Sequence, residues 1–244
     1  MSRDPKPPAP IDRPAGSQPA KPADDVTAFL SKVAAMPKVT KVGEGGRLIF
    51  ALDATASREP TWDQACRIQG EMFTATASLG GLEVQMAYYR GFHEFQAGRW
   101  ASSGQQLIRE MTGVHCLAGQ TQIERVLRHA LVETRRKRVG AVVFVGDALE
   151  EEIDRLAVPA GELGLLGVPV FMFHEGGKPL VARGFQHIAK LSKGAYCAFD
   201  LSSAETLRRL LAAVAVYAAG GRAALADYSK RAGPEVRLLT SQLD

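Results

Sequence analysis

The sequence predicts an α/β fold: a doubly wound, mostly parallel sheet with one antiparallel edge strand and helices on both faces. From Arg47 onward, short apolar runs alternate with segments whose apolar residues recur at helical spacing, which is typical of parallel strands joined by helices. Two runs, 48–52 and 139–145, are apolar throughout, as in central strands covered on both sides. The segment 91–100 follows a strand directly and has Phe92, Glu94 and Gln96 at alternate positions, which predicts the antiparallel edge strand.

Each expected element has a local signal. Strands are expected in chain order at 48–52, 82–90, 91–100, 139–145, 168–173 and 195–199. The first helix is expected to start at about Thr61, a fair N-cap, and its apolar residues at helical spacing are Trp62, Ala65, Ile68, Met72 and Phe73. Ser102 and Ser103 open a second helix, to about Met111, and a third runs from Glu124 to Arg138. Further helices are expected at about 148–163, 184–193 and 203–219, the last one apolar and capped by Ser203.

The ends of the chain differ from this central part. Residues 1–24 hold more than half of the 13 prolines and almost no apolar residue except alanine, which predicts a disordered or polyproline-II tail. A specific proline-motif ligand is the alternative interpretation of that tail. Residues 25–44 are expected to form a short helix and a linker, residues 45–220 the α/β domain, and residues 221–244 a C-terminal extension.

Composition restricts the environment and the partners. The formal net charge is +4, and acidic and basic residues are interleaved, so a dedicated nucleic-acid binder is not required. The three cysteines, Cys66, Cys116 and Cys197, are far apart and odd in number, which favours a reducing compartment. The amino terminus has no apolar core of a signal peptide, and no apolar run is long enough to cross a bilayer. We therefore expect a cytoplasmic protein without a membrane partner.

Five oxygen-bearing residues follow strands or precede a helix in this pattern. Asp53, Thr55 and Ser57 follow the first buried strand, Thr121 precedes a helix, and Asp147 follows the strand at 139–145. The carboxyl ends of parallel strands meet at the edge where such sheets bind ligands. In an extended loop, alternate residues point the same way, so the first three can converge. Hard cations such as Mg²⁺ prefer oxygen ligands, whereas zinc prefers nitrogen and sulfur.

These motifs resemble the von Willebrand factor type A (VWA) domain, with its metal-ion-dependent adhesion site, MIDAS, on a Rossmann-like fold. Asp53-Ala54-Thr55-Ala56-Ser57 matches Asp-x-Thr-x-Ser, Gly119-Gln120-Thr121 matches Gly-x-Thr, and Asp147 matches the aspartate after the fourth strand. The resemblance implies that Thr55, Ser57 and Thr121 are hydroxyl ligands of Mg²⁺ or Mn²⁺, with Asp53 and Asp147 binding directly or through water. Thr55 stands where a serine is usual, and Ala148 where a glycine often follows the aspartate.

The resemblance also implies a function. It points to a bacterial-type intracellular adaptor or accessory module that is not an enzyme, and in which a carboxylate of a protein partner completes the metal shell. The partner-binding rim is then expected at Gln120, Glu150, His174 and Glu175. A loop cap is the alternative interpretation of Asp53. The acids at 150–152 and Asp154 are interpreted as first-turn residues favoured by the dipole of the helix expected from Ala148.

Two other functions stay open. An aspartate-nucleophile phosphatase with Mg²⁺ would use Asp53 to attack phosphorus, but the acid that should serve as proton donor two residues later is Thr55. RNA association could use the basic run at 135–138, although a helix C-terminus favours basic residues anyway. His115 and Cys116 are adjacent, but the sequence places no partner for nucleophilic catalysis beside them. No GxGxxG motif follows a strand, so nucleotide-dependent dehydrogenase chemistry is not indicated.

Overall fold

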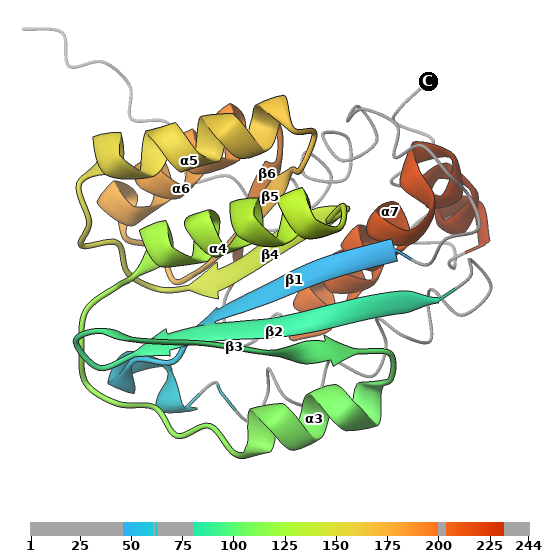
Figure 1. Cartoon of the computed structure of the whole chain (residues 1–244). Helices are drawn as coiled ribbons and strands as arrows, with labels where there is room; N and C mark the ends of the chain where they lie inside the picture. Colours follow the sequence, from blue (N-terminus) through green and yellow to red (C-terminus); the bar gives the residue numbers. More distant parts are fainter. Residues whose placement is uncertain (1–45, 61, 63–80, 200–203, 232–244) are drawn as a thin grey trace, which may run out of the picture.

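A computed structural model of the chain describes residues 46–60, 62, 81–199 and 204–231. These residues form a six-stranded sheet in the order β3-β2-β1-β4-β5-β6 (Figure 1). The strands are β1 (Gly46–Asp53), β2 (Leu82–Arg90), β3 (Glu94–Ala101), β4 (Ala141–Gly146), β5 (Val170–Glu175) and β6 (Ala195–Phe199). The pair β2 and β3 is antiparallel, and the other neighbouring pairs are parallel. The predicted fold class, including the antiparallel edge strand, is confirmed.

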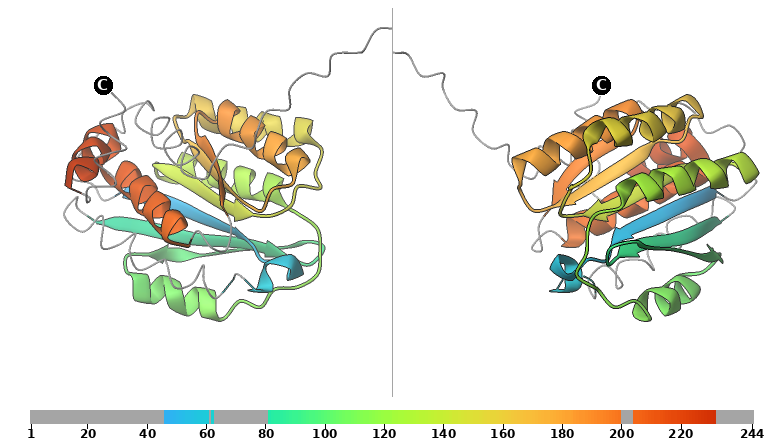
Figure 2. Two further views of the ribbon diagram at one scale, coloured as in Figure 1. Left: turned by 180° about the vertical axis from the view of Figure 1, so that it is seen from behind. Right: turned by 60° about the vertical axis from the view of Figure 1, so that its left-hand side comes forward.

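Helices cover both faces of the sheet (Figure 2). One face packs against α4 (Ile123–Arg136), α5 (Ile153–Leu165) and α6 (Pro179–Leu191), and the other against α3 (Gly104–Thr112) and α7 (Ala204–Arg231). Strand β1 contributes to both cores, with Leu48 and Phe50 on the α3 and α7 side and Ile49 and Ala51 on the opposite side. The strand is apolar throughout because successive side chains point to opposite faces, and both are buried.

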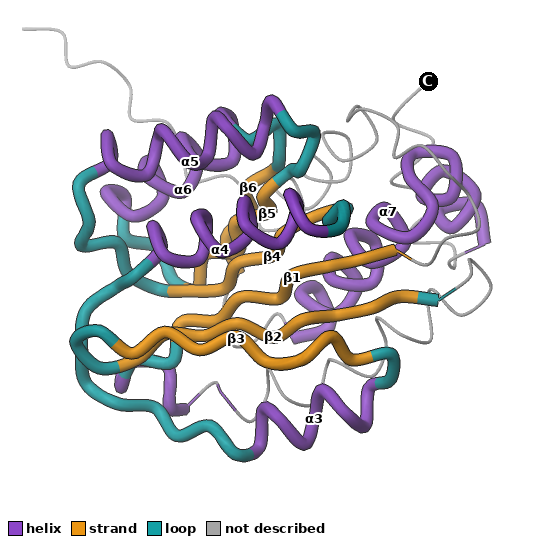
Figure 3. Tube along the Cα trace, viewed as in Figure 1, coloured by secondary structure: helices purple, strands orange, loops and turns teal. Residues whose placement is uncertain are grey.

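The strand order reverses between β1 and β4. From β1 the chain builds β2 and β3 on one side, and then returns to build β4, β5 and β6 on the other. Leu52 lies opposite Val145 in the parallel pair of β1 and β4, so both strands end at the same edge (Figure 1, where their arrowheads point to it). The loop between α3 and α4 also runs along this edge (Figure 3). Doubly wound sheets bind their ligands at such a reversal point.

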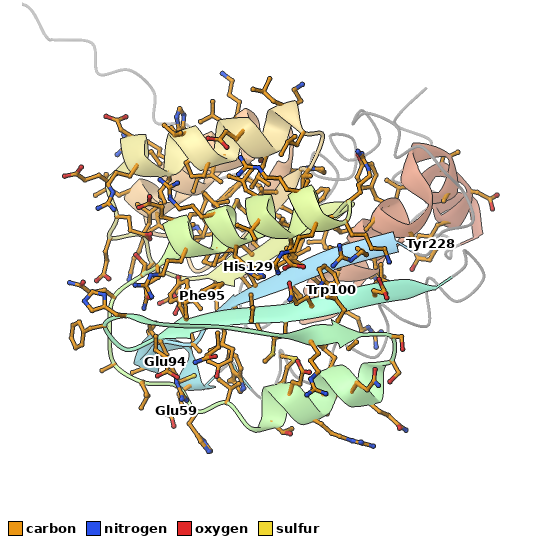
Figure 4. The ribbon with its side chains drawn as sticks, in the orientation of Figure 1. Glu59, Glu94, Phe95, Trp100, His129 and Tyr228 are labelled. Atoms are coloured by element: carbon orange, nitrogen blue, oxygen red, sulfur yellow. The ribbon has the colours of Figure 1, made fainter. Side chains whose placement is uncertain are left out.

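Polar and aromatic contacts fasten α4 to the sheet edge. The Arg47 guanidinium lies 3.6 Å from the centre of the Trp100 ring and 3.2 Å from the Glu133 carboxylate. The Trp100 indole donates to Glu133 at 3.0 Å, and the rings of Phe95 and His129 are 5.4 Å apart. Figure 4 labels Phe95, Trp100 and His129 where β3 and α4 come together. These contacts fix α4, and therefore the loop before it, relative to β1 and β2.

Helix α5 begins at Ile153, five residues later than the expected start at Ala148, so that expectation was wrong. Residues 148–152 form a loop instead, because two acids of this loop, Glu150 and Glu151, accept hydrogen bonds from backbone N–H groups at and just before the start of α4. The Glu151 carboxylate accepts hydrogen bonds from the backbone N–H of Ile123 and Glu124, at 2.9 and 2.8 Å, at the start of α4. Glu151 is therefore an acid at the N-terminus of α4 rather than of α5, and Glu150 binds the N–H of Thr121 just before α4. For Asp154 the prediction is confirmed, because it lies in the first turn of α5.

The last two helices also differ from the expected bounds. Helix α6 begins at Pro179 rather than at residue 184, since proline suits the first turn, where its missing N–H is not needed. Helix α7 continues past residue 219 to Arg231, with a kink at Gly221, whose φ of 69° is accessible to glycine. The kink lies beside the expected end of the helix at about residue 219, and Leu225, beyond the kink, is buried in the core on the same side of the sheet.

Several predictions concern residues outside the described part. These are the tail at 1–24, the helix and linker at 25–44, most of the helix expected from Thr61, the cap at Ser203 and residues 232–244. Trp62 is described, and it is buried with its indole donating to the Met111 carbonyl at 3.2 Å. The helix start expected at Ser102 and Ser103 is confirmed, because the Ser103 hydroxyl accepts a hydrogen bond from the Gln106 N–H at the start of α3.

The Glu151→Ala variant is expected to lose about 1–2 kcal/mol of unfolding free energy, because two N–H groups at the start of α4 lose their acceptor. Urea unfolding followed by circular dichroism measures the loss. Glu152→Ala is the matched control, since Glu152 is exposed and makes no cap hydrogen bond, and it should change stability by less than about 0.5 kcal/mol. Equal losses in the two variants would contradict the capping role.

Candidate metal centre

Two acidic residues lie side by side where the strand order reverses. Asp53 is the last residue of β1, and Asp147 directly follows β4, its parallel neighbour. A Cβ atom placed on Gly146 would lie 3.3 Å from the Asp53 Cβ, which shows how closely the end of β4 approaches this side chain. The two strands therefore bring together carboxylates that are far apart in the sequence.

The Asp53 carboxylate is fully buried and is held at both oxygens. Its Oδ1 accepts from the backbone N–H of Thr55 at 2.8 Å, and its Oδ2 accepts from the Tyr89 hydroxyl at 3.0 Å. Burial raises the pKa of Asp53 and the neighbouring Asp147 adds to the rise, whereas the hydrogen bonds from Thr55 and Tyr89 oppose it. A nearby cation would favour the ionised form in the same way as these donors do.

Tyr89 was missed by sequence reasoning. It lies opposite Asp53 in the register of β1 and β2. Burial raises the pKa of Tyr89 well above its ordinary value, so the phenol stays protonated and acts as a donor. Its position near the end of the strand expected at 82–90 was a usable signal, because it placed this hydroxyl at the same edge of the sheet.

Two hydroxyls connect the aspartates. Thr55 Oγ1 lies 3.2 Å from Ser57 Oγ, and the Ser57 hydroxyl donates to Asp147 Oδ1 at 3.1 Å. Thr55 is extended, but residues Ala56–Arg58 form the 3₁₀ turn η1, so the expectation of a fully extended loop was wrong. The turn still brings the side chains together. Ser57 is exposed, whereas Thr55 and Asp53 are buried, so the series opens to solvent at Ser57.

Thr121 is bound to the loop after β4. Its hydroxyl accepts from the backbone N–H of Glu150 at 3.0 Å, and its own N–H donates to the Glu150 carboxylate at 2.9 Å. Thr121 is buried, and the second lone pair of its hydroxyl oxygen stays available to a further partner. This pair of hydrogen bonds ties Thr121 to the segment that carries Asp147.

The four residues expected at the rim do not form one surface. Gln120 and Glu150 are exposed. His174 is fully buried, with its Nδ1 3.0 Å from the Tyr196 hydroxyl and its ring against Phe185, so it presents nothing to a partner. The expectation of a rim position for His174 was wrong, because β5 turns this residue toward the core between the sheet and α6.

The fourth expected rim residue, Glu175, points to a charged residue that sequence reasoning also missed. The Glu175 carboxylate forms an ion pair with Arg58, the last residue of η1, and it is mostly buried. The Arg58 side chain is only 2% exposed. Burial lowers the pKa of Arg58, while the carboxylates of Asp53 and Asp147 oppose this shift. The sequence shows a basic residue directly after Ser57, but a surface position would have been equally compatible with that pattern.

Comparison with known proteins identifies the architecture. No family model matches the sequence, and no curated protein does. The solved SpRpn10 VWA domain matches with a TM-score of 0.55 at 10% identity, over 72% of this chain and 97% of that one. An aerotolerance-related membrane protein from Bacteroides fragilis matches with a TM-score of 0.52 at 18% identity, over 68% of this chain and 98% of that one.

A third structure, proximal thread matrix protein 1 from the mussel byssus, was solved with a zinc-occupied MIDAS motif. It matches with a TM-score of 0.57 at 16% identity, over 73% of this chain and 48% of that one. This chain has the VWA fold. None of its described helices is both long and apolar enough to cross a membrane.

The side chains that come together at the carboxyl ends of β1 and β4 offer oxygen atoms as ligands. Within the described ranges, no three His, Cys, Asp or Glu side chains gather closely enough to hold a metal, so a shell here depends on hydroxyl oxygens. Hard divalent cations prefer oxygen ligands, and the site offers two carboxylates with two hydrogen-bonded hydroxyls between them. The residues therefore fit such a cation. Cys116 is a poor nucleophile at neutral pH, because burial raises the pKa of its thiol to about 11.

Acidification from pH 7.5 to about 5 is expected to destabilise the protein through the buried His174 and the half-buried His129. Burial lowers the pKa of both His129 and His174, so the unfolded chain takes up protons first as the pH falls through about 6.5. Stability is therefore complete above that pH and is lost as the pH decreases toward the folded-state values. The double variant His129→Gln, His174→Gln should show a shallower decrease of melting temperature with pH. An unchanged slope would contradict the assignment.

Proposed function

We propose that this chain is a non-catalytic protein-binding module whose contacts depend on a divalent cation, Mg²⁺ or Mn²⁺. The observation that carries the proposal is the hydrogen-bonded series from Asp53 through Thr55 and Ser57 to Asp147. Thr55, Ser57 and Thr121 would supply hydroxyl oxygens, and Asp53 and Asp147 would bind directly or through water. The exposed end at Ser57 leaves room for an Asp or Glu carboxylate of a protein partner. The role is that of a cytoplasmic adaptor or accessory protein.

The surface around the site supports a protein partner. Phe92, 63% exposed, lies in the turn between β2 and β3, and Leu117, 46% exposed, lies in the loop between α3 and α4. Residues 53–58, which carry Asp53, Thr55 and Ser57, are called the metal loop. Leu117 N–H donates to the carbonyl of Ala54 in this loop at 3.1 Å, and Gly91 N–H donates to the carbonyl of Leu117 at 3.5 Å. These backbone contacts place Leu117 next to the loop that carries Thr55 and Ser57, and they place the turn that carries Phe92 next to Leu117. A partner that presents an acidic residue beside an apolar one would match both features.

The two alternative functions have less support. A phosphatase would need an acid at position 55, where Thr55 instead contacts Ser57. Three of the four residues in the basic run at 135–138, the run that could touch RNA, form surface ion pairs with the chain's own acids. Arg135 pairs with Glu162, Arg136 with Glu133 and Lys137 with Glu83. A phosphate-binding surface would need these cations to be available.

Titration with Mn²⁺ in a calorimeter tests the metal site directly. The Ser57→Ala variant should bind Mn²⁺ about ten-fold more weakly or worse, because it removes a hydroxyl ligand that also orients Asp147. Ser102→Ala, which removes an exposed hydroxyl before α3, should bind like the unaltered chain. The same titrations are repeated with Mg²⁺ and with Zn²⁺ to compare the three ions. Equal affinities for the two serine variants would contradict the proposed ligand set.

The partner surface has its own test. For a partner captured in Mg²⁺ and released by EDTA, Phe92→Ala should weaken capture about ten-fold, as expected for an aromatic anchor at an interface. The matched control is Leu165→Ala, since Leu165 is 86% exposed but lies at the far end of α5, away from the carboxyl ends of the strands. Both variants should bind Mn²⁺ normally. Loss of capture in the Leu165 variant alone would place the interface elsewhere.

A further inference from the structure

The turn between β2 and β3 is held against the loop that precedes α4. Gly91 opens the turn with a φ of 58°, which suits glycine, and the next residue, Phe92, is 63% exposed. A Cβ atom placed on Gly119 would overlap the backbone of Gly91, so the two segments are in direct contact. In Figure 3 the loop between α3 and α4 passes beside this turn. The exposed aromatic residue therefore belongs to a segment that touches the Gly119-Gln120-Thr121 motif.

Hydrogen bonds from both neighbours of Thr121 reach the same turn. The Gln120 N–H donates to the Gly91 carbonyl at 3.1 Å. The side-chain amide of Gln122 donates to the carbonyls of Arg90 and Gly91, at 3.2 and 3.3 Å. A displacement of Thr121 would therefore act on the turn through the residue on each side of it.

The start of α4 leaves the Gln122 side chain available for this contact. Gln122 is the N-cap residue of α4, but its side chain makes no cap hydrogen bond, because the Glu151 carboxylate binds the first N–H groups of the helix instead. Gln122 is only 8% exposed, and a buried amide donor without an acceptor would be unfavourable. In the first turn of α4, the Arg125 guanidinium donates to the His93 carbonyl at 2.8 Å. The start of α4 is therefore bound to both ends of the β2–β3 turn.

We infer that Gln122 is a positioning residue that couples Thr121 to the turn carrying Phe92, so that a cation held by Thr121 sets where this aromatic side chain meets the partner. The inference rests on the proposed metal-dependent function and deepens it. The cation would then act on the apolar part of the interface as well as on the carboxylate of the partner. The partner surface that fits is an acidic residue with an apolar side chain held at a fixed distance from it.

The alternative is that the strand pair alone fixes the turn. Arg90 lies opposite Glu94 in the register of β2 and β3, and their side chains form an ion pair at 2.8 Å. In that case Gln122 only fills space beside the turn, and a cation at Thr121 leaves the turn unchanged. The two roles differ in whether the metal changes the turn and in whether that change passes through Gln122.

Amide hydrogen exchange of the full chain, measured by NMR with and without saturating Mg²⁺, separates these roles. The reporter is the Gly91 N–H, which donates to the Leu117 carbonyl across the contact. In the unaltered chain, Mg²⁺ should slow its exchange about three-fold or more. Gln122→Met removes the donor and keeps the length of the side chain. In this variant the metal-free exchange of Gly91 should be about ten-fold faster, and Mg²⁺ should no longer slow it.

Two controls accompany the exchange measurement. Gln105→Met, at an exposed position of α3, should behave like the unaltered chain. Calorimetric titration with Mg²⁺ should give an affinity for Gln122→Met within about three-fold of that of the unaltered chain, because the coupling between two sites is reciprocal and is expected to be of that size.

The outcomes distinguish this inference from the proposed function. If the unaltered chain binds Mg²⁺ but the exchange of Gly91 does not respond, the coupling is overturned and the metal site stands. The same conclusion follows if a folded Gln122→Met variant keeps the metal-free exchange rate of the unaltered chain or its response to Mg²⁺. If the unaltered chain does not bind Mg²⁺, both are overturned. Should Gln122→Met fail to fold, the response of Gly91 in Gln122→Glu, which has the same size but lacks the amide donor, decides.

Discussion

The burial of the Asp53 carboxylate at the end of β1 is the constraint on which the rest of the site depends. A carboxylate removed from water needs donors or a cation around it. The neighbouring strand supplies the Tyr89 hydroxyl, and the metal loop turns back so that Thr55 N–H reaches the other oxygen. That turn places Ser57 against Asp147 and buries Arg58 behind it. The shape of the loop thus follows from solvating one side chain.

A second set of acids holds the start of α4 and the residues before it against the loop that follows β4. The loop after β4 uses Glu150 and Glu151 to bind the N–H groups of Thr121, Ile123 and Glu124. The Thr121 hydroxyl binds back to this loop. Thr121 is consequently bound to the loop that directly follows Asp147, although Thr121 and Asp147 are 26 positions apart in the sequence. A movement of the β4–α5 loop would therefore carry both residues.

The VWA fold by itself does not assign a function, because one fold can carry many sites. The structures compared share 10% to 18% of their residues with this chain. The proposed function is supported instead by the oxygen donors, by the exposed position of Ser57 and by the exposed apolar residues Phe92 and Leu117. A metal at this edge would be reached from outside, which suits contact with another protein.

The sequence by itself determined the α/β architecture, the edge strand and the edge of the sheet at which Asp53, Thr55, Ser57 and Asp147 come together. Hydrophobic periodicity and strand ends are local signals, and a parallel sheet converts them into position. Only the tertiary structure decided the roles of Tyr89 and Arg58, the burial of His174, and the capping of α4 by Glu151. Each of these depends on a contact between segments distant in sequence, and a polar side chain carries no local mark of which distant partner will satisfy it once it is buried.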